Sequence, residues 1–340
     1  MARFRWRQWL LVGLMLVSLV VACQPQAEEE IGAAPCRVVT HAAGTACIPE
    51  SIQRLVTLDG VTFEYAIAAG LSPIGTAVSG LMDHLAEQVT QVENVGVSGE
   101  PNLERVLALK PDLIVGLDYN QSAYAQASQI APTLLFEFEH SGQWKTVFQQ
   151  FAAALNQAEV AQQTLADYEA RLATFKAQMG ERLNTLQVSV VRIYPDTINL
   201  YLRDSFVGII LQDAGLARPP AQNIGAEEAT ARFGNPIQTS ISRELLAQAD
   251  GDVIFVWTSE NTPEAAATAQ QNLQSLQQDP LWQQLKAVQA GRVYQVPSYW
   301  IGSGPIAANA VVGDLLKTHS GFSSPPSPIA EALSSLHFDL

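Results

Sequence analysis

Arginine and tyrosine side chains alternate along two neighbouring segments in the second half of the chain. Arg192 and Tyr194 stand two residues apart at the end of one predicted strand, and Tyr201 and Arg203 stand two apart in the next. Because side chains two residues apart in a strand point to the same face, each pair shares a face. Guanidinium groups supply charge-assisted hydrogen bonds, and the aromatic rings supply apolar contact. With Arg232 in a following loop, the set predicts a site for a bulky anionic ligand with apolar parts.

Three further aromatic residues come shortly after predicted strands, namely Tyr119, Trp257 and Trp300. In open α/β sheets, ligands bind outside the carboxyl ends of the strands, so these rings are candidate ligand contacts. The competing interpretation places each tryptophan in ordinary core packing and each arginine at a solvated strand position. The combination of arginines and aromatic rings within one acidic chain favours the binding interpretation.

Two glutamates occupy matching positions in a repeated pattern. Residues 102–114 and 242–254 align at an offset of 140, and each segment has a helix-capping residue, a glutamate at the second helical position and an aspartate that opens a strand. The glutamates are Glu104 and Glu244. The plainest role of each is to stabilise the start of its helix through the helix dipole. The repeat indicates two lobes of similar plan; the alternative is a chance similarity between two ordinary helix–strand units.

The composition narrows the possible functions. The 340 residues are 48% hydrophobic and 15% charged, which supports a large core. Nineteen basic against 33 acidic residues give a net charge of −14, and there is no basic block, so no nucleic-acid partner is expected. The five histidines are scattered, so we expect no metal site. Because the sequence has no nucleophile elbow, phosphate-binding loop, dinucleotide fingerprint or zinc-protease motif, we expect no enzyme, and an extracytoplasmic hydrolase is the second hypothesis.

The beginning of the chain is typical of an export signal. Three arginines precede an apolar run that ends at Cys23. A basic start followed by an apolar stretch of this length favours a secretory signal over the alternative, an uncleaved anchor. The junction before Cys23 resembles the lipobox of bacterial lipoproteins, in which the cysteine becomes the lipidated first residue. We therefore expect a lipoprotein signal peptide over 1–22, lipidation of Cys23 and a flexible tether over 23–35.

The two remaining cysteines flank a predicted hairpin. Residues 37–46 have the pattern of two short strands around a glycine-containing turn, with Cys36 before them and Cys47 after them. A disulfide between these cysteines fits an oxidising exterior. Two separate buried thiols are the alternative.

The elements that must position these side chains alternate between strand and helix, which is typical of an α/β fold. A stretch without glycine or proline breaks near 155–159 and continues as a predicted helix over 157–182, roughly 38 Å long. We therefore predict two Rossmann-like lobes with central parallel sheets, joined by a single long α-helix, with the ligand cleft between the lobes. The expected parts are an N-terminal lobe at 36–150, an interlobe helix at 151–185, a C-terminal lobe at 186–319 and a low-structure tail at 320–340.

Four stretches resemble the substrate-binding proteins of iron-siderophore and cobalamin ABC importers, namely 54–60, 101–115, 200–206 and 279–294. The resemblance covers about residues 50–319. In that family two glutamates, one in each lobe, dock into arginine pockets of the membrane permease, and Glu104 and Glu244 fall at those positions. The family also links its lobes by a long helix and closes only slightly on its ligand. The Cys36/Cys47 pair departs from the usual hairpin of the family.

The resemblance implies an extracytoplasmic, lipid-anchored receptor that binds a ferric siderophore and delivers it to an ABC permease dimer. The hairpin and the stretch after Leu200 are more similar to siderophore receptors than to cobalamin receptors; cobalamin or haem is the alternative ligand. Iron enters only as part of the ferric-siderophore ligand, so no cofactor is expected. We expect a monomer on the outer face of the cytoplasmic membrane, in the periplasm if the cell has an outer membrane.

Overall fold

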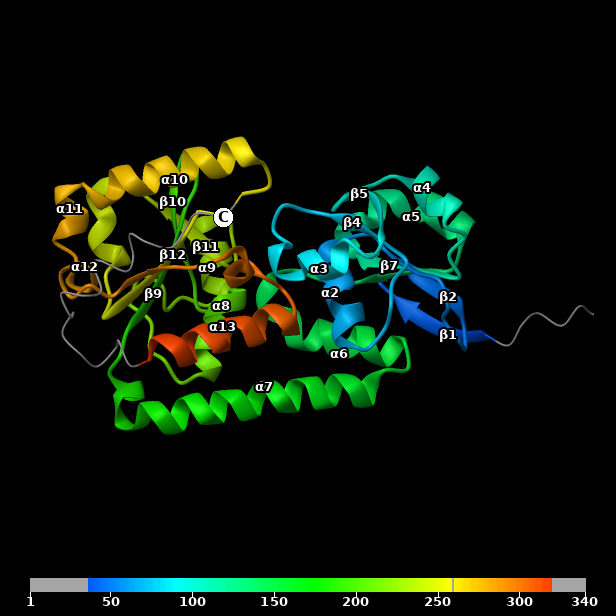
Figure 1. Ribbon diagram of the computed structural model, residues 1–340, viewed down its shortest axis with the longest axis horizontal. Coiled ribbons are helices and arrows are strands. Elements are labelled where there is room, and N and C mark those ends of the chain that lie inside the picture. Colours follow the sequence, from blue (N-terminus) through cyan, green and yellow to red (C-terminus); the bar gives the residue numbers. More distant parts are fainter. Residues whose placement is uncertain (1–35, 259, 320–340) are drawn as a thin grey trace, which may run out of the picture.

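Two lobes stand side by side above one long helix in the computed structural model, which describes residues 36–258 and 260–319 (Figure 1). The predicted fold class, two α/β lobes joined by a long helix, is confirmed. The expected signal peptide, the lipidation site Cys23, the tether and the tail lie outside the described residues.

The N-terminal lobe is built on a six-stranded sheet in the order β6-β5-β4-β3-β7-β8. All neighbours are parallel except β5 and β6. The central strands β3 and β7 consist entirely of buried residues, as expected where helices cover both faces of a parallel sheet. The strands are β3 (Leu55–Thr57), β4 (Gly75–Val78), β5 (Glu93–Val97), β6 (Glu100–Pro101), β7 (Leu113–Leu117) and β8 (Thr133–Phe136). The helices are α2 (Gly60–Ala68), η1 (Asp83–Leu85), α3 (Ala86–Val89), α4 (Leu103–Ala108), η2 (Asp118–Asn120), α5 (Gln121–Ile130), η3 (Ser141–Gln143) and α6 (Trp144–Ala154).

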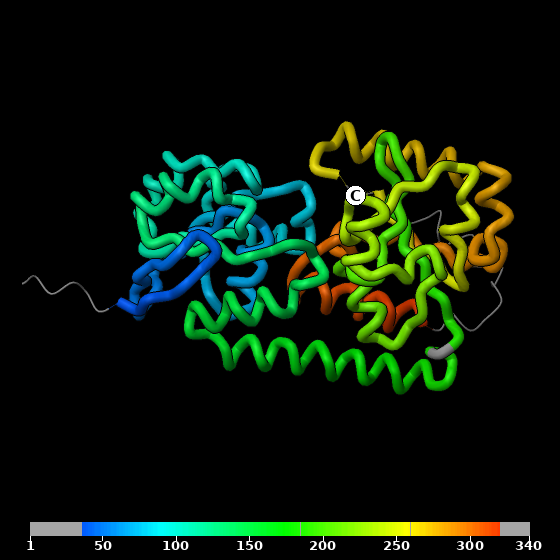
Figure 2. Tube along the Cα trace, turned by 180° about the vertical axis from the view of Figure 1, so that it is seen from behind, coloured from blue at the N-terminus to red at the C-terminus, as the bar shows by residue number. Residues whose placement is uncertain are grey.

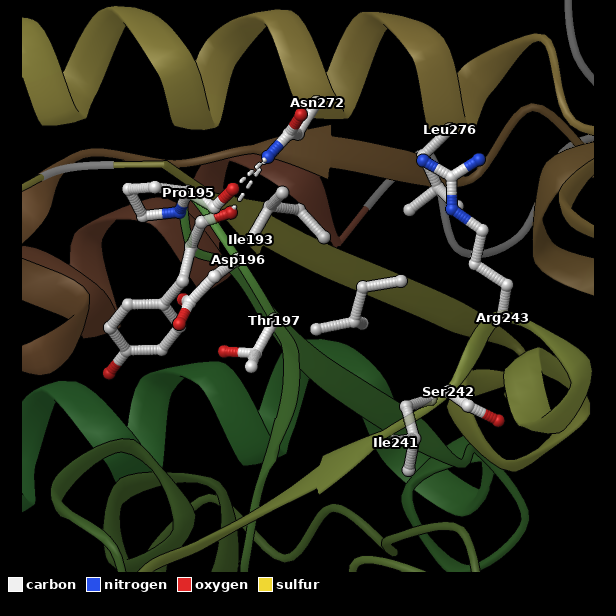
Figure 3. Close-up of a pocket in the computed structure, with 11 residues that line it drawn as sticks. Ile193, Pro195, Asp196, Thr197, Ile241, Ser242, Arg243, Asn272 and Leu276 are labelled. Carbon is white, nitrogen blue, oxygen red and sulfur yellow. Dashed lines mark hydrogen bonds between the residues drawn. The ribbon is translucent and has the colours of Figure 1, made fainter.

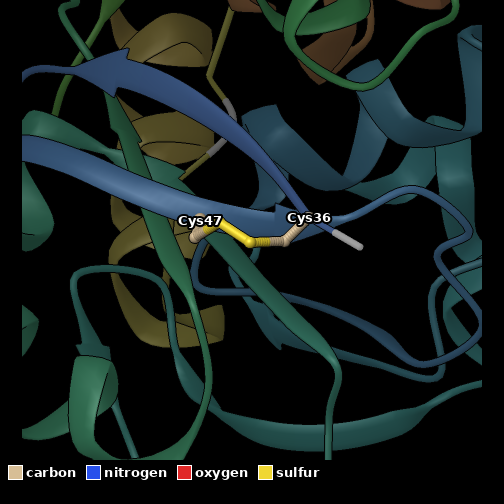
Figure 4. Close-up of a disulfide and its surroundings, with 2 residues drawn as sticks. All are labelled: Cys36 and Cys47. Atoms are coloured by element: carbon tan, nitrogen blue, oxygen red, sulfur yellow. A yellow bond between two sulfur atoms is a disulfide. The ribbon is translucent and has the colours of Figure 1, made fainter. Parts of the chain in front are cut away.

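A separate hairpin covers the β8 edge of this sheet. It consists of β1 (Cys36–His41) and β2 (Gly44–Pro49), and the Ala42 backbone amide donates to the Leu135 carbonyl of β8 at 2.9 Å. Cys36 and Cys47 form a disulfide across the hairpin, with 5.5 Å between their Cα atoms (Figure 4). The two cysteines therefore close a short loop at the end of the N-terminal lobe that is remote from the C-terminal lobe (Figure 2).

Replacing both Cys36 and Cys47 by serine is expected to lower the free energy of unfolding by about 2–3 kcal/mol, because the unfolded chain regains the entropy that the closed loop removes. Denaturant titration of the exported protein measures this change, with the reduced wild-type protein as the control. Two free thiols in the natively exported wild type, detected by mass spectrometry of non-reduced peptides, would contradict the expectation.

The C-terminal lobe has a mixed five-stranded sheet in the order β11-β10-β9-β12-β13. Strands β9, β12 and β13 are parallel, and β10 runs antiparallel to both of its neighbours. The four residues between β9 and β10 are too few for a crossover, which forces this antiparallel pairing. The strands are β9 (Val188–Ile193), β10 (Ile198–Tyr201), β11 (Gln238–Ile241), β12 (Val253–Trp257) and β13 (Val293–Gln295). The helices are α8 (Phe206–Asp213), α9 (Ala226–Phe233), η5 (Arg243–Ala249), α10 (Pro263–Gln277), α11 (Pro280–Gln283), α12 (Lys286–Gln289), η6 (Ser298–Ile301) and α13 (Pro305–Thr318).

The helix α7 (Ala158–Met179) runs beneath both lobes and is followed by η4 (Gly180–Asn184) (Figures 1 and 2). Its 22 residues span about 33 Å, and it ends where Gly180 takes a positive φ of 58°. Tyr168 of α7 donates to the Asp213 carboxylate of α8 at 2.7 Å, and Lys145 of α6 forms an ion pair with the same carboxylate at 2.5 Å. One acidic group thus joins the interlobe helix to both lobes.

A second interlobe junction lies at the start of α13. The buried Glu64 of α2 accepts a hydrogen bond from the Ala307 backbone amide at 2.8 Å and lies 3.1 Å from Nε2 of His84. A Cβ atom on Gly304 would lie only 2.4 Å from the Glu64 carboxyl carbon, so any larger residue there would push the carboxylate from its present position. Since the first amides of a helix have no partner within the helix, a carboxylate from the N-terminal lobe completes a helix of the C-terminal lobe.

The two aspartates of the 140-residue repeat have the same structural role in their lobes. The Asp112 carboxylate accepts hydrogen bonds from the Gln53 and Arg54 backbone amides at the entry to β3. The Asp252 carboxylate accepts one from the Gln187 amide at the entry to β9. In each lobe the aspartate therefore fixes the start of the neighbouring parallel strand.

Candidate functional site

The loops that follow the carboxyl ends of the parallel strands meet between the two lobes. Gly80 follows β4, and a Cβ atom at this position would lie 2.8 Å from the backbone oxygen of Asn261, which follows β12. Ser298 follows β13, and its hydroxyl donates to the Asp83 carboxylate of the N-terminal lobe at 3.3 Å. This is the edge of an open α/β sheet at which ligands bind.

Arg192 is the main charged group of the C-terminal lobe at this edge. It lies on β9, opposite Trp257 of β12, and is 7% exposed. Its guanidinium forms an ion pair with Glu260 at 3.2 Å and donates to the Tyr201 hydroxyl at 3.3 Å. The centre of the Tyr194 ring lies 4.0 Å from the guanidinium carbon, at cation–π distance. The structure therefore brings together three of the residues that the sequence predicted, Arg192, Tyr194 and Tyr201.

Electrostatics keep this guanidinium charged. Burial alone would lower the pKa of Arg192, but Tyr201, Tyr194 and Glu260 raise it above its ordinary value. Burial has the opposite effect on the Tyr201 hydroxyl. It raises the pKa of this group, which therefore stays protonated. The cluster thus contains a guanidinium cation beside a protonated Tyr201 hydroxyl, and it can present hydrogen-bond donors to an anionic oxygen.

Trp257 and Trp300 are not ligand contacts in the structure. Both side chains are completely buried in the core of the C-terminal lobe. The Trp257 ring packs edge-on against Tyr201 at 4.8 Å, and the Trp300 indole donates to Asp314 at 3.0 Å. Trp257 is the last residue of β12 and Trp300 lies in η6, and the core of the lobe encloses both positions. The core-packing alternative is correct for both tryptophans.

The other predicted ligand contacts lie outside the Arg192 cluster. Arg203 follows β10 and pairs with its neighbour Asp204 at 3.2 Å. Arg232 lies on α9, with its side chain 53% exposed, and pairs with Glu228 one turn away at 2.7 Å. Tyr119 is in η2 of the N-terminal lobe and is 47% exposed.

A surface pocket of about 310 Å³ lies beside the hairpin between β9 and β10 (Figure 3). The Asn272 amide holds the hairpin by donating to the Tyr194 and Pro195 carbonyls at 3.1 and 2.7 Å. Arg243 and Ser242 form the opposite wall, next to Glu244 in sequence. Tyr194 lines this pocket and also contacts Arg192, so the pocket borders the arginine–tyrosine cluster, although Arg192 and Tyr201 do not line it.

Glu104 and Glu244 are both exposed and both stand in the first turn of a short helix. The helix that carries Glu104 is α4, whose cap Asn102 accepts from the Arg105 amide at 3.0 Å, whereas Glu244 lies in the 3₁₀ segment η5. A hydrogen bond from Ser242 lowers the pKa of the Glu244 carboxyl. Each glutamate is accompanied by an exposed leucine on the same segment, Leu107 at 57% and Leu245 at 46%. The structure thus gives the two lobes similar acidic and apolar surface groups.

Glu260 was not anticipated from the sequence. It follows β12, which is the neighbour of β9 in the sheet, and this adjacency places its carboxylate on Arg192. Its position three residues after a buried strand, at the binding edge, is the signal that points to it.

Two features are absent from the part of the chain that the structure describes. Within residues 36–258 and 260–319 there is no group of three or more histidine, cysteine, aspartate or glutamate side chains placed to hold a metal ion. Over the same residues, no helix has the length and apolar character needed to cross a membrane.

Known proteins similar to this chain share most of its length. Bacillus subtilis (strain 168) has a "Probable siderophore-binding lipoprotein YfiY" that is 34% identical over 319 residues, which cover 90% of this chain and 95% of the relative. The "Achromobactin-binding periplasmic protein" of Dickeya dadantii (strain 3937) is 28% identical and covers 78% of this chain, with 86% of the relative matched.

Solved structures show the same fold. The crystal structure of Staphylococcus aureus SirA complexed with staphyloferrin B matches with a TM-score of 0.71 and 26% identity, covering 84% of this chain and 98% of that one. The family model described as periplasmic binding protein matches residues 55–300, which include both sheets and the Arg192 cluster. Because this match spans well over half of the sequence, the chain belongs to the periplasmic binding protein family.

Proposed function

We propose that this protein is the receptor of an ABC importer, and that it captures a ferric siderophore between its lobes and delivers it to the permease. The observation that carries the proposal is the position of Arg192, a charged guanidinium flanked by Tyr194 and Tyr201 at the sheet edge that faces the other lobe. An anionic chelate with apolar parts fits these donors and rings.

The relatives support an iron chelate as the ligand. The Bacillus relative is named for siderophore binding and the Dickeya relative for achromobactin binding, and the similar Staphylococcus structure holds staphyloferrin B. Iron within such a chelate already has its ligands, so the receptor needs no metal-binding side chains of its own. We therefore propose reversible binding without covalent chemistry and without a cofactor.

Tryptophan fluorescence of the purified mature protein tests the proposed ligand. Trp257 packs against Tyr201, which contacts Arg192, so a ligand at this cluster should change its emission. Titrations with a panel of ferric siderophores, cobalamin and haem should show saturable quenching by at least one ferric siderophore. Saturation by cobalamin or haem alone would assign the protein to the alternative ligand class. No response to any compound, checked by calorimetry, would contradict the proposed function.

We also propose that the mature protein is a monomer held on the outer face of the cytoplasmic membrane by lipid on Cys23. The support is the lipobox-like sequence before Cys23 and a relative that is named as a lipoprotein. Two or more acyl chains are sufficient for stable anchoring, whereas one is marginal.

Replacing Cys23 by serine is expected to move the protein from the membrane fraction to the soluble fraction, because the acceptor of the lipid is lost. Cell fractionation measures this shift, and Cys36→Ser/Cys47→Ser, which keeps Cys23, is the control. An intact mass of the wild-type protein without acyl chains would show that the lipobox interpretation is wrong.

Permease docking through Glu104 and Glu244 is the remaining part of the proposal. Glu104 lies in the N-terminal lobe and Glu244 in the C-terminal lobe, and each is exposed beside an exposed leucine. A dimeric permease would offer one subunit to each of these glutamates.

A further inference from the structure

We propose that Glu260 is an internal counter-ion of Arg192, and that a ferric chelate carrying carboxylates binds by taking its place. This inference rests on the proposed function and deepens it, because it names the chemical class of the chelate. Glu260 would then be a specificity-determining residue, since only a chelate with an anionic oxygen of its own can take its place.

The first step is the burial of the ion pair. The side chains of Arg192 and Glu260 are 9% and 13% exposed, and their charged atoms lie 3.2 Å apart. A guanidinium this far from water needs a negative partner, and removing one without replacement is strongly unfavourable. Whatever displaces Glu260 must therefore carry an anionic oxygen of its own.

The second step is that Arg192 and Glu260 are carried by different kinds of backbone segment. Arg192 lies within β9, which is paired on both sides, and Tyr201 and Tyr194 hold its guanidinium. Glu260 lies on the irregular segment between β12 and α10. Rotation of the glutamate side chain away from the cluster breaks no sheet hydrogen bond. Of the two charges, the carboxylate is thus the one that can leave.

The third step is the location of the glutamate. Its neighbour Asn261 borders Gly80 of the N-terminal lobe, so the carboxylate lies where the loops of the two lobes meet. A ligand that enters between the lobes reaches the ion pair from this side. A chelate carboxylate can then form the same charge-assisted hydrogen bonds with Arg192 that Glu260 gives up.

This exchange produces selectivity by charge. A carboxylate chelate replaces one ion pair by another, whereas a chelate without anionic groups leaves the Arg192–Glu260 pair in place and gains no contact with the guanidinium. The difference in affinity between the two classes of chelate is therefore the contact with Arg192 that only the carboxylate class gains.

The test compares Glu260→Gln with the wild type by fluorescence titration against three probes: ferric citrate, ferric staphyloferrin B and ferrioxamine B. Glutamine keeps the size of the side chain but removes the competing charge. We expect the affinity for at least one carboxylate chelate to rise about tenfold, a change of roughly 1.4 kcal/mol, and that for ferrioxamine B to change much less. Glu264→Gln, an exposed glutamate in the first turn of α10, is the matched control and should change neither affinity.

A second variant, Glu260→Asp, tests the inference if Glu260→Gln does not fold. Glu260→Asp keeps the charge but withdraws it from Arg192 by one methylene group, so it should raise the affinity for the carboxylate chelates by a smaller factor. Unchanged or lower affinity of both folded variants would overturn the inference and leave the proposed function standing. Wild-type binding of ferrioxamine B but of neither carboxylate chelate would also overturn it. If the wild type binds no probe and no other ferric siderophore, the proposed function itself fails.

Discussion

Cells carrying Glu104→Gln/Glu244→Gln are expected to lose siderophore-dependent iron uptake, while the purified variant binds its ligand as well as the wild type. Both carboxylates are exposed and lie in first turns, so their removal disturbs no core packing. If each carboxylate holds one lobe over an arginine pocket of the permease, the loss of both leaves the receptor without its charged contacts. Radiolabelled-iron uptake, set against ligand affinity in vitro, measures the effect.

The matched control for this experiment is Glu159→Gln/Glu264→Gln. Glu159 and Glu264 are also exposed and also stand in the first turns of their helices, α7 and α10, so the control loses the same helix-end charges. It should transport iron normally. Each single docking variant should retain more uptake than the double variant, because one lobe stays attached. Normal uptake by the double variant at normal expression would remove both residues from docking and leave them as helix-end charges.

Replacing Arg192 by glutamine is expected to weaken siderophore binding by tenfold to a hundredfold. The guanidinium can give an anionic chelate charge-assisted hydrogen bonds, each of about 1.5–3 kcal/mol, and glutamine cannot restore their charge. Because Glu260 loses its partner in this variant, the double change Arg192→Gln/Glu260→Gln separates ligand contact from the effect of a buried unpaired carboxylate. Fluorescence titration gives the affinities, and thermal unfolding of the ligand-free protein reports any loss of folding.

Variants of Arg232 and Lys176 provide the comparison with the Arg192 variant. Arg232→Ala should weaken binding less than Arg192→Gln, because Arg232 is half exposed and its charge is screened by water and by Glu228. Lys176→Gln removes an exposed charge from α7, away from the sheet edges, and should have no effect on affinity. Affinity that is unchanged in the Arg192 variants would show that the ligand binds elsewhere.

The sequence predicted the elements that have strong local signals. Buried runs predict strands over 112–116, 188–193 and 252–256, which correspond within a residue to β7, β9 and β12. The stretch without glycine or proline predicts α7, which ends at Met179 rather than at residue 182. The sequence does not predict the elements η1, α3, β5, β6, α9 and β11. These are short, and several are largely exposed, so hydrophobic periodicity carries little information about them.

Within the site, the alternation of residues identifies which side chains share a strand face. It does not identify what packs around them. The alternation of Arg192 and Tyr194 gave a shared face, and the cluster with Tyr201 follows from the hairpin between β9 and β10. The burial of Trp257 and Trp300 depends on helices far away in sequence, such as α13. The Glu260 contact depends on β12 lying next to β9, a strand order that no local pattern contains.

The junction at Glu64 has a consequence for the order in which the protein assembles. The helix α13 packs against α2, α6, α7 and α8, yet it begins only at Pro305, near the end of the described chain. A chain that emerges from its N-terminus exposes α2 and Glu64 long before their partner, the Ala307 amide, arrives. The first lobe therefore cannot reach its final packing until the start of α13 has emerged. A truncated chain that stops before Pro305 should accordingly be a substrate for proteases throughout both lobes.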